Sequence, residues 1–226
     1  MSIPILRQAR AVLLDFDGPV CSIFAGYPAD RIADELRRTL VVRGVDLTAE
    51  LAATDDPLEV LRLTADVAPH LVPEMDDELT HAEVLAAHTA ATTPGAVEFL
   101  EQCHRAGLPV VVVSNNSELG VRTYLKQHQD LALIHHVVGR PLHRPRLMKP
   151  HPAVVRAALA HLDLTADQVV LIGDSVTDVE VARRLSVPSI ALANRPEKVE
   201  PLTRAQPDVV IRHMTDLLDD VPPPVG

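Results

Sequence analysis

The sequence predicts an α/β fold, a doubly wound parallel sheet with an inserted all-α cap domain. Three observations indicate it. Short apolar runs alternate with helical segments through most of the chain, and one block of four helical segments interrupts this alternation. The composition is 47% hydrophobic but only 2% aromatic. The core must therefore be built from Val, Leu, Ile and Ala, which suits parallel strands covered by helices.

The first strand is expected at the start of the stretch AVLLDFDGPV, residues 11–20, where an apolar run ends abruptly in Asp-Phe-Asp-Gly. A loop should follow as far as residue 27. From Pro28 to about residue 91 the pattern is helical, and Gly44, Pro57, Pro69 and Pro73 divide it into four pieces. Four successive helices do not fit a strand-helix alternation. We therefore interpret residues 21–92 as the helical cap and residues 1–20 and 93–226 as the α/β core.

The alternation resumes after Pro94. The apolar runs predict strands, and the amphipathic segments between them predict crossover helices. Strands are expected at residues 108–113, 134–138, 168–172, 189–193 and 208–211. Helices are expected at residues 96–107, 117–128, 152–161 and 176–185, with a short helical piece after residue 196.

Charge and composition exclude several functions. The formal net charge of −10 argues against nucleic acid and anionic membrane as partners. The two cysteines, Cys21 and Cys103, lack metal-site spacing and favour a reduced protein. No signal peptide or membrane span is apparent, so a cytoplasmic protein is expected. We expect a monomer or a homodimer.

Polar side chains follow three of the predicted strands, and a lysine precedes the helix that begins near Pro152. These residues are Asp15, Asp17, Ser114, Asn115, Lys149, Asp174 and Asp178. In a parallel sheet the strand ends meet at one edge, where ligands bind. Each signal alone has an ordinary explanation, such as a helix cap, a turn or a solvated charge. Their order and their placement at strand ends make a shared site the better interpretation.

Together these groups suit phosphoryl transfer. Three neighbouring carboxylates suit Mg²⁺. Ser114 is expected where a helix begins, so that its hydroxyl and the following N–H groups can hold phosphate oxygens. Lys149 can neutralise charge on the phosphoryl group and on a nucleophilic carboxylate. A carboxylate can attack phosphorus to give an aspartyl-phosphate, which divides a slow hydrolysis into two easier steps.

The chain resembles the haloacid dehalogenase-like superfamily of hydrolases, in the phosphatase branch with a helical cap, and is similar to phosphoglycolate phosphatase and beta-phosphoglucomutase-like proteins. The four matching motifs are Asp15-Phe16-Asp17-Gly18, Val113-Ser114-Asn115, Lys149-Pro150 and the run from Gly173 to Asp178. The resemblance spans the whole chain. It is specific for the superfamily and not for the substrate.

The resemblance implies a role for each motif residue. Asp15 would be the nucleophile and a Mg²⁺ ligand, and Asp17 would give the metal its backbone carbonyl while its side chain acts as acid and base. Asp174 would be the remaining carboxylate on Mg²⁺. Ser114, Asn115 and Lys149 would bind the phosphoryl group. Asp178 would orient Lys149 or a metal-bound water.

One departure from the family pattern is Pro19, where Thr or Val is usual. Proline lacks a backbone N–H and fixes φ, which puts the flap geometry and cap opening in doubt.

Three further groups of polar residues have less specific patterns. The basic loop, defined here by Arg140, His143, Arg144 and Arg146, could contact a second anionic group of a substrate, but we expect it to be solvated. His135, His136 and His151 fit no usual zinc spacing. The cap residues able to select a substrate are Tyr27, Arg37, Arg38, Arg62, His81 and His88.

The leading hypothesis is a Mg²⁺-dependent phosphatase that hydrolyses a small phosphorylated metabolite through an aspartyl-phosphate. A hexose-phosphate mutase would share every core motif and would move the phosphoryl group between positions of a sugar phosphate. A non-catalytic phosphate-ligand-binding protein of the same fold is a third hypothesis. Dehalogenase activity is disfavoured, because Asp17 supplies an acid/base group that carbon–halogen displacement does not need.

Overall fold

The computed structural model describes residues 2–223, so the first residue and the last three residues of the predicted core lie outside it. Six parallel strands form the main sheet, in the order β5-β4-β1-β6-β7-β8. The strands are β1 (Ala11–Leu14), β4 (Val110–Val113), β5 (His136–Val138), β6 (Val169–Gly173), β7 (Ser189–Leu192) and β8 (Val209–Ile211). β1 is central, and Leu14 is in register with Val112 on one side and Ile172 on the other.

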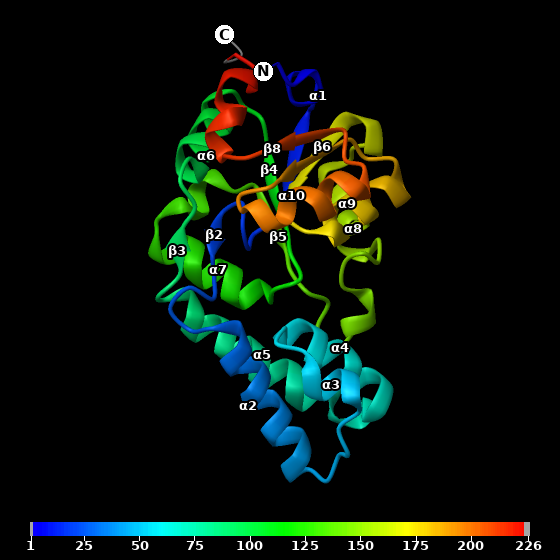
Figure 1. Cartoon of the computed structure of the whole chain (residues 1–226). Helices are drawn as coiled ribbons and strands as arrows, with labels where there is room; N and C mark the ends of the chain where they lie inside the picture. The colour runs from blue at the N-terminus through cyan, green and yellow to red at the C-terminus, as the bar shows by residue number, and fades with distance from the viewer. Residues whose placement is uncertain (1, 224–226) are drawn as a thin grey trace.

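Helices cover both faces of this sheet (Figure 1). Alternate residues of β1 divide between the two faces, as the period-2 geometry of a strand requires. Val12 and Leu14 belong to a cluster with residues of α6 and α7, and Leu13 packs with residues of α8 and α9. The core helices are α6 (Ala96–Arg105), α7 (Glu118–Gln127), α8 (Ala153–Leu162), α9 (Val176–Leu185) and α10 (Pro196–Ala205).

Four further helices form a separate body beyond the carboxyl ends of the strands (Figure 1). They are α2 (Ala29–Val42), α3 (Ala49–Ala53), α4 (Pro57–Val67) and α5 (Val72–Ala87). They enclose their own apolar cluster, which includes Leu36, Leu61 and Leu79. The predicted fold class, a doubly wound parallel sheet with a helical cap, is confirmed.

A small ribbon connects the two bodies and was not predicted. β2 (Cys21–Ser22) pairs antiparallel with β3 (Ala91–Thr92). The predicted domain boundaries fall at this ribbon, and the division into 21–92 and the two core segments stays a prediction. Two residues in each strand are too few to give an alternating pattern in the sequence.

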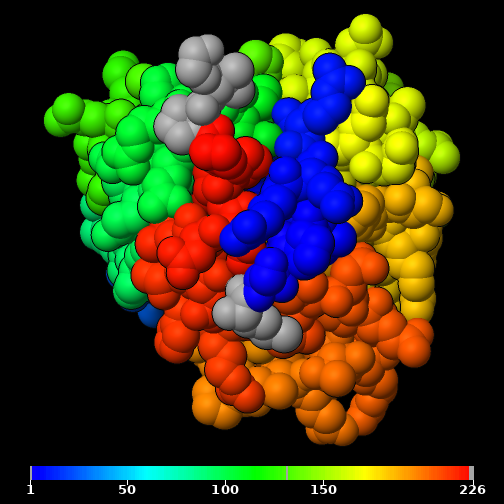
Figure 2. Space-filling view, turned by 90° about the horizontal axis from the view of Figure 1, so that it is seen from above, coloured from blue at the N-terminus to red at the C-terminus, as the bar shows by residue number. Residues whose placement is uncertain are grey.

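The two ends of the described chain meet on the face opposite the cap, where Figure 2 shows the N-terminal segment against the C-terminal one. Nε of Arg7, in α1 (Pro4–Arg7), lies 2.6 Å from Oδ1 of Asp220. The remaining helical turns are of the 3₁₀ type, at Pro69–Leu71, Asp130–Leu133, Pro145–Leu147, Ala166–Gln168 and Met214–Asp220. Among the described residues, no helix is both long and apolar enough to span a membrane.

Candidate active site

The predicted site residues converge because β4, β1 and β6 are neighbours in the sheet and end at the same edge. A cavity of about 230 Å³ lies at this edge, between the sheet and the cap. Its lining includes Asp15, Asp17, Ser114, Asn115, Lys149 and Asp174. A larger groove of about 870 Å³ lies beside β5 and includes none of these residues. We therefore place the candidate active site in the smaller cavity.

Lys149 is the buried cation of this site. Its Nζ atom lies 2.8 Å from Oδ1 of Asp15 and 2.6 Å from Oδ1 of Asp178, and it donates to the carbonyl oxygen of Val113 at 2.9 Å. Burial alone would lower the pKa of Lys149, but the two carboxylates outweigh burial and raise it. Lys149 is therefore held as an ammonium group. Asp178 has a second anchor, because its Oδ2 accepts the backbone N–H of Ser175 at 3.1 Å.

The two acids of the first motif lie in different surroundings. Burial raises the pKa of Asp15 well above its ordinary value, and the nearby carboxylates of Asp178 and Asp174 raise it further. Burial also raises the pKa of Asp17, from 3.8 to about 6, although its Oδ1 accepts the backbone N–H of Ile23 at 3.0 Å. Asp17 can therefore hold and release a proton near neutral pH.

Three carboxylates are close enough to share a cation. Asp15, Asp174 and Asp178 each offer an oxygen within 4.8 Å of the others. Burial raises the pKa of Asp15 and that of Asp174 although Lys149 and Lys198 lie beside them, so the cluster needs more positive charge than these two ammonium groups provide. A hard divalent cation with oxygen ligands would supply that charge, so this donor set fits Mg²⁺. Both oxygens of Asp178 have partners, Lys149 at Oδ1 and Ser175 at Oδ2, whereas the contacts of Asp15 and of Asp174 in the described chain use one oxygen each. Asp15 and Asp174 are therefore the better placed metal ligands.

Lys198 is a site residue that the sequence analysis missed. It comes from α10, and its ammonium group forms an ion pair with Oδ2 of Asp174. Its side chain is 28% exposed, at the edge of a second cavity that Asp17 and Asp174 also line. Lys198 belongs to none of the motifs and does not directly follow a strand, so the sequence gives no signal for it. The first turn of α10 brings it to Asp174.

The loop after β4 differs from its prediction. Ser114 was expected where a helix begins, but α7 begins at Glu118, and Ser117 caps it by accepting the N–H of Gly120 at 3.2 Å. The start of α7 agrees with the helix expected from residue 117, but three loop residues separate it from Ser114, so the expectation that Ser114 lies where a helix begins is wrong. Ser114 itself is fully buried at the cavity, and its Oγ donates to Oδ1 of Asn116 at 3.1 Å.

Asn115 contacts Lys149 directly. Its Oδ1 accepts the backbone N–H of Lys149 at 2.7 Å, and its Nδ2 donates to the carbonyl oxygen of Lys149 at 3.2 Å. Both polar atoms of the side chain therefore hold the backbone of the third motif. The predicted contact of Asn115 with phosphate stays a prediction, and it would have to come from the backbone of Asn115.

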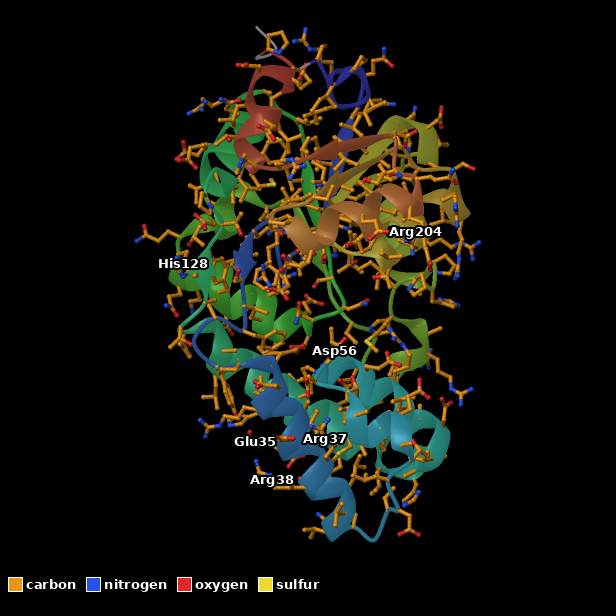
Figure 3. All side chains as sticks on the ribbon, in the orientation of Figure 1. Glu35, Arg37, Arg38, Asp56, His128 and Arg204 are labelled. Carbon is orange, nitrogen blue, oxygen red and sulfur yellow. The ribbon has the colours of Figure 1, made fainter. Side chains whose placement is uncertain are left out.

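Among the predicted cap residues, only Arg62 lines the cavity, together with Asp56 and Leu58 of the same region. Nη2 of Arg62 donates to the carbonyl oxygen of Lys149 at 3.3 Å. Figure 3 shows Asp56 at the end of the cap that faces the core and Arg38 on the outer side of α2. The other candidates have partners elsewhere or are exposed: Tyr27 binds Glu35, Arg37 binds the Thr54 carbonyl, His88 binds Gln127, and His81 is exposed.

The basic loop divides into two parts. The expectation of a solvated loop is correct for His143, Arg144 and Arg146. It is wrong for Arg140, whose side chain is 1% exposed. Two acids of the cap helix α5, Asp76 and Glu83, pair with its guanidinium group. These two carboxylates take the place of water as partners of the buried charge.

Pro19 lies in a tight turn directly after the first motif. The N–H of Gly18 donates to the carbonyl of Cys21 at 2.6 Å, and the N–H of Val20 donates to the carbonyl of Phe16 at 3.0 Å. The turn closes through these two groups, so the missing N–H of Pro19 costs no hydrogen bond. Thr93, the residue after β3, holds the same turn in place, because its Oγ1 donates to the carbonyl oxygen of Gly18 at 2.5 Å.

The fold and the four motifs define the class of protein. A family model described as haloacid dehalogenase-like hydrolase matches residues 9–185, which is most of the chain. The chain therefore belongs to the haloacid dehalogenase-like hydrolases, and the predicted resemblance is confirmed.

Relatives of known name point in the same direction. The chain is 27% identical to a phosphoglycolate phosphatase of Aliivibrio fischeri, over 82% of this chain and 78% of that protein. It is 26% identical to a phosphoglycolate phosphatase of Vibrio cholerae, over 96% of this chain and 98% of that protein.

Solved structures share the fold. A predicted phosphatase from Clostridium acetobutylicum has a TM-score of 0.73 at 18% identity, covering 93% of this chain and 97% of its own. CbbY from Rhodobacter sphaeroides in complex with phosphate has a TM-score of 0.69 at 18% identity, covering 94% of this chain and 99% of its own.

Proposed function

We propose that this protein is a Mg²⁺-dependent phosphatase that hydrolyses a small phosphorylated metabolite through an aspartyl-phosphate on Asp15. The observation that carries the proposal is the contact of Lys149 with both Asp15 and Asp178 inside the cavity that Ser114 and Asp17 also line. The names of the relatives, phosphoglycolate phosphatases, support hydrolysis of a phosphate ester over the mutase and binding hypotheses.

In the first step, a carboxylate oxygen of Asp15 forms a bond to phosphorus as the bond to the leaving oxygen breaks. Asp17 gives its proton to that oxygen. Its pKa of about 6 suits this role, because the group can hold and release a proton near neutral pH. Lys149 and Ser114 hold the phosphoryl oxygens, and the ammonium group of Lys149 balances their charge. Mg²⁺, held by Asp15, Asp174 and the backbone carbonyl of Asp17, would neutralise charge on the phosphoryl group.

In the second step, water attacks phosphorus and gives its proton to Asp17, and the bond between phosphorus and Asp15 breaks to release inorganic phosphate. Asp17 is then protonated for the next cycle. Asp178 keeps Lys149 in place through both steps, because its Oδ1 binds Nζ of Lys149 at 2.6 Å.

The dimensions of the site favour a small substrate. The cavity of about 230 Å³ leaves room for a phosphoryl group and a leaving group of a few heavy atoms. Asp56 and Arg62 offer a carboxylate and a guanidinium to that leaving group. Because the named relatives are phosphoglycolate phosphatases, 2-phosphoglycolate is the first substrate to test.

The test is phosphate release from a panel of 2-phosphoglycolate, glycerol phosphates and hexose phosphates, with Mg²⁺ and with EDTA. We expect release that requires Mg²⁺ and falls about a thousand-fold or more in Asp15→Asn. Equal rates for wild type and variant would exclude the covalent mechanism. Conversion of one hexose phosphate isomer to another without phosphate release would establish the mutase instead. Silence across the panel, with phosphate still bound, would favour the binding protein.

A further inference from the structure

A buried junction of charges joins cap helix α5 to the core beside the active site. Arg140 follows β5 and donates through Nε to Oδ1 of Asp76 at 2.7 Å and through Nη1 to Oε1 of Glu83 at 2.8 Å. The three side chains are at most 1% exposed. Buried charges are tolerated only where their partners are well placed, so this junction requires a specific geometry.

The junction also holds the loop after β4. Oε1 of Glu83 accepts Nδ2 of Asn116 at 3.1 Å, and Oε2 accepts the backbone N–H of Ser117 at 2.9 Å. Arg140 adds two contacts, from its backbone N–H to the carbonyl of Asn116 at 2.8 Å and from Nη1 to the carbonyl of Asn115 at 2.9 Å. One cap residue and one core residue thus fix three successive loop residues.

This loop places the groups that face the phosphoryl site. Asn116 exchanges two hydrogen bonds with Ser114, donating its N–H to Oγ and accepting from Oγ at Oδ1, both at 3.1 Å. Asn115 holds the backbone of Lys149 through both polar atoms of its side chain. A displacement of residues 115–117 would therefore move both Ser114 and Lys149.

We propose that Glu83, together with Arg140, is a positioning residue for phosphate binding. Its carboxylate fixes the conformation of residues 115–117, so that the Ser114 hydroxyl and Lys149 are held ready for a phosphoryl group. The cap thereby contributes to phosphate binding from a residue that does not line the cavity. This inference rests on the proposed function in that Ser114 and Lys149 are taken to bind phosphate.

The hydrogen bonds at Glu83 make a conservative substitution informative. Each oxygen receives two donors: Oε1 accepts from Asn116 and Arg140, and Oε2 accepts from Ser117 and from Nη2 of Arg140 at 3.3 Å. In Glu83→Gln one carboxylate oxygen is replaced by an NH₂ group, which can donate but not accept. In either orientation of the amide, this NH₂ group faces two N–H donors that the oxygen had accepted. The variant keeps the shape of the side chain and disrupts its contacts with the loop.

The matched control is Asp76→Asn, on the same helix and against the same arginine. Asp76 contacts Arg140 and the backbone N–H of His143, and within the described part of the chain none of its hydrogen bonds reaches residues 114–117. A second control is Asp77→Asn, an exposed acid of α5 that contacts His143. If the junction only attached the cap to the core, Glu83→Gln and Asp76→Asn would affect the active site equally.

The experiment measures the Kd of inorganic phosphate in the presence of Mg²⁺, and separately the hydrogen exchange of residues 114–118 without ligand. All assays are run below the unfolding transition of each variant. For Glu83→Gln we expect a Kd about ten-fold higher, as for loss of one charge-assisted positioning contact, and faster exchange of this segment. For Asp77→Asn we expect a Kd within about two-fold of wild type and unchanged exchange. For Asp76→Asn, which leaves the contacts between Arg140 and Glu83 in place, we expect smaller changes in Kd and exchange than for Glu83→Gln.

A second variant covers the case in which Glu83→Gln does not fold. Asn116→Ala keeps the ion pairs of Arg140 and removes the link between Glu83 and Ser114, so it should raise the phosphate Kd about as much. Unchanged exchange in Glu83→Gln, or equal effects of Glu83→Gln and Asp76→Asn on the Kd, would overturn the proposal. If the wild type neither binds nor releases phosphate, the proposed function fails, and hydrogen exchange alone then decides whether Glu83 holds the loop.

Discussion

The carboxylate of Asp174 lies in the space that a side chain at position 18 would need. A Cβ atom on Gly18 would be 2.0 Å from Oδ2 of Asp174, far inside contact distance, and the backbone φ of Gly18 is +106°. Glycine is therefore required twice at this position, for its backbone conformation and for the approach of the fourth motif to the first. The two motifs fit together only because residue 18 has no side chain.

Gly18→Ala should displace Asp174 and lower phosphatase activity by about a hundred-fold, the loss expected when a catalytic group moves by about 1 Å. The matched control is Gly107→Ala, because Gly107 also has a positive φ, +66°, but no atom lies within 4 Å of its Cβ position. Both variants should lose about 1 kcal/mol of stability from backbone strain. Steady-state kinetics and urea denaturation separate the two effects. Equal activity of the two variants would contradict the steric argument.

The pKa of Asp17 predicts a pH-dependent stability in the metal-free protein. Burial raises this pKa from 3.8 to about 6 in the folded state, so the folded protein binds the proton more tightly than the unfolded chain between these values. The stability that Asp17 contributes is present below pH 4 and is lost as the pH rises through 6. The rise in the pKa of Asp17 corresponds to a change in folding stability of about 3 kcal/mol at most over this pH range.

Asp17→Asn removes this dependence, because an amide does not titrate. In EDTA, the variant should gain stability relative to wild type as the pH rises from 4 to 7, by up to about 3 kcal/mol. Urea denaturation at several pH values measures the difference directly. A constant difference across this range would show that Asp17 is not destabilised by burial.

The site could be predicted from the sequence where its groups follow regular strands. β1, β4 and β6 are apolar runs that end in polar residues, and the geometry of a parallel sheet brings such ends together without knowledge of the contacts. This geometry alone was enough to predict that Asp15, Ser114 and Asp174 lie close together. The helical cap was predictable for a similar reason, since four helical segments cannot continue a strand-helix alternation.

The rest depends on contacts between distant segments. Arg140 lies in a loop rich in basic residues, and nothing near it shows that Asp76 and Glu83, more than fifty residues earlier, would enclose it. Lys198 lies on a helix of mixed charge, and its role comes only from its distance to Asp174. Ion pairs between residues far apart in the sequence leave no local pattern. The sequence therefore predicted an exposed side chain for Arg140, although the fold buries it against two acids.

Lys149→Met should destabilise the protein, because it leaves the carboxylates of Asp15 and Asp178 buried without their cation. Removing one partner of a buried ion pair costs about 3–5 kcal/mol, and we expect a loss in this range in the absence of Mg²⁺. Lys126→Met is the control, because Lys126 is exposed and its loss should change stability by less than about 0.5 kcal/mol. Chemical denaturation in EDTA gives both values. A loss as small as that of the control would mean that Asp15 and Asp178 do not need Lys149 for stability.

Lys198 should compete with the metal for Asp174. Its ammonium group pairs with Oδ2 of Asp174, one of the carboxylates expected to bind Mg²⁺, and two cations at one carboxylate repel each other. Lys198→Met should therefore bind Mg²⁺ about three- to five-fold more tightly, in line with ~1 kcal/mol for a partly exposed ion pair. Lys198→Arg keeps the charge and should resemble wild type. Calorimetric titration with Mg²⁺ measures both variants without any substrate. Weaker Mg²⁺ binding by Lys198→Met would show instead that Lys198 holds Asp174 in the orientation that the metal requires.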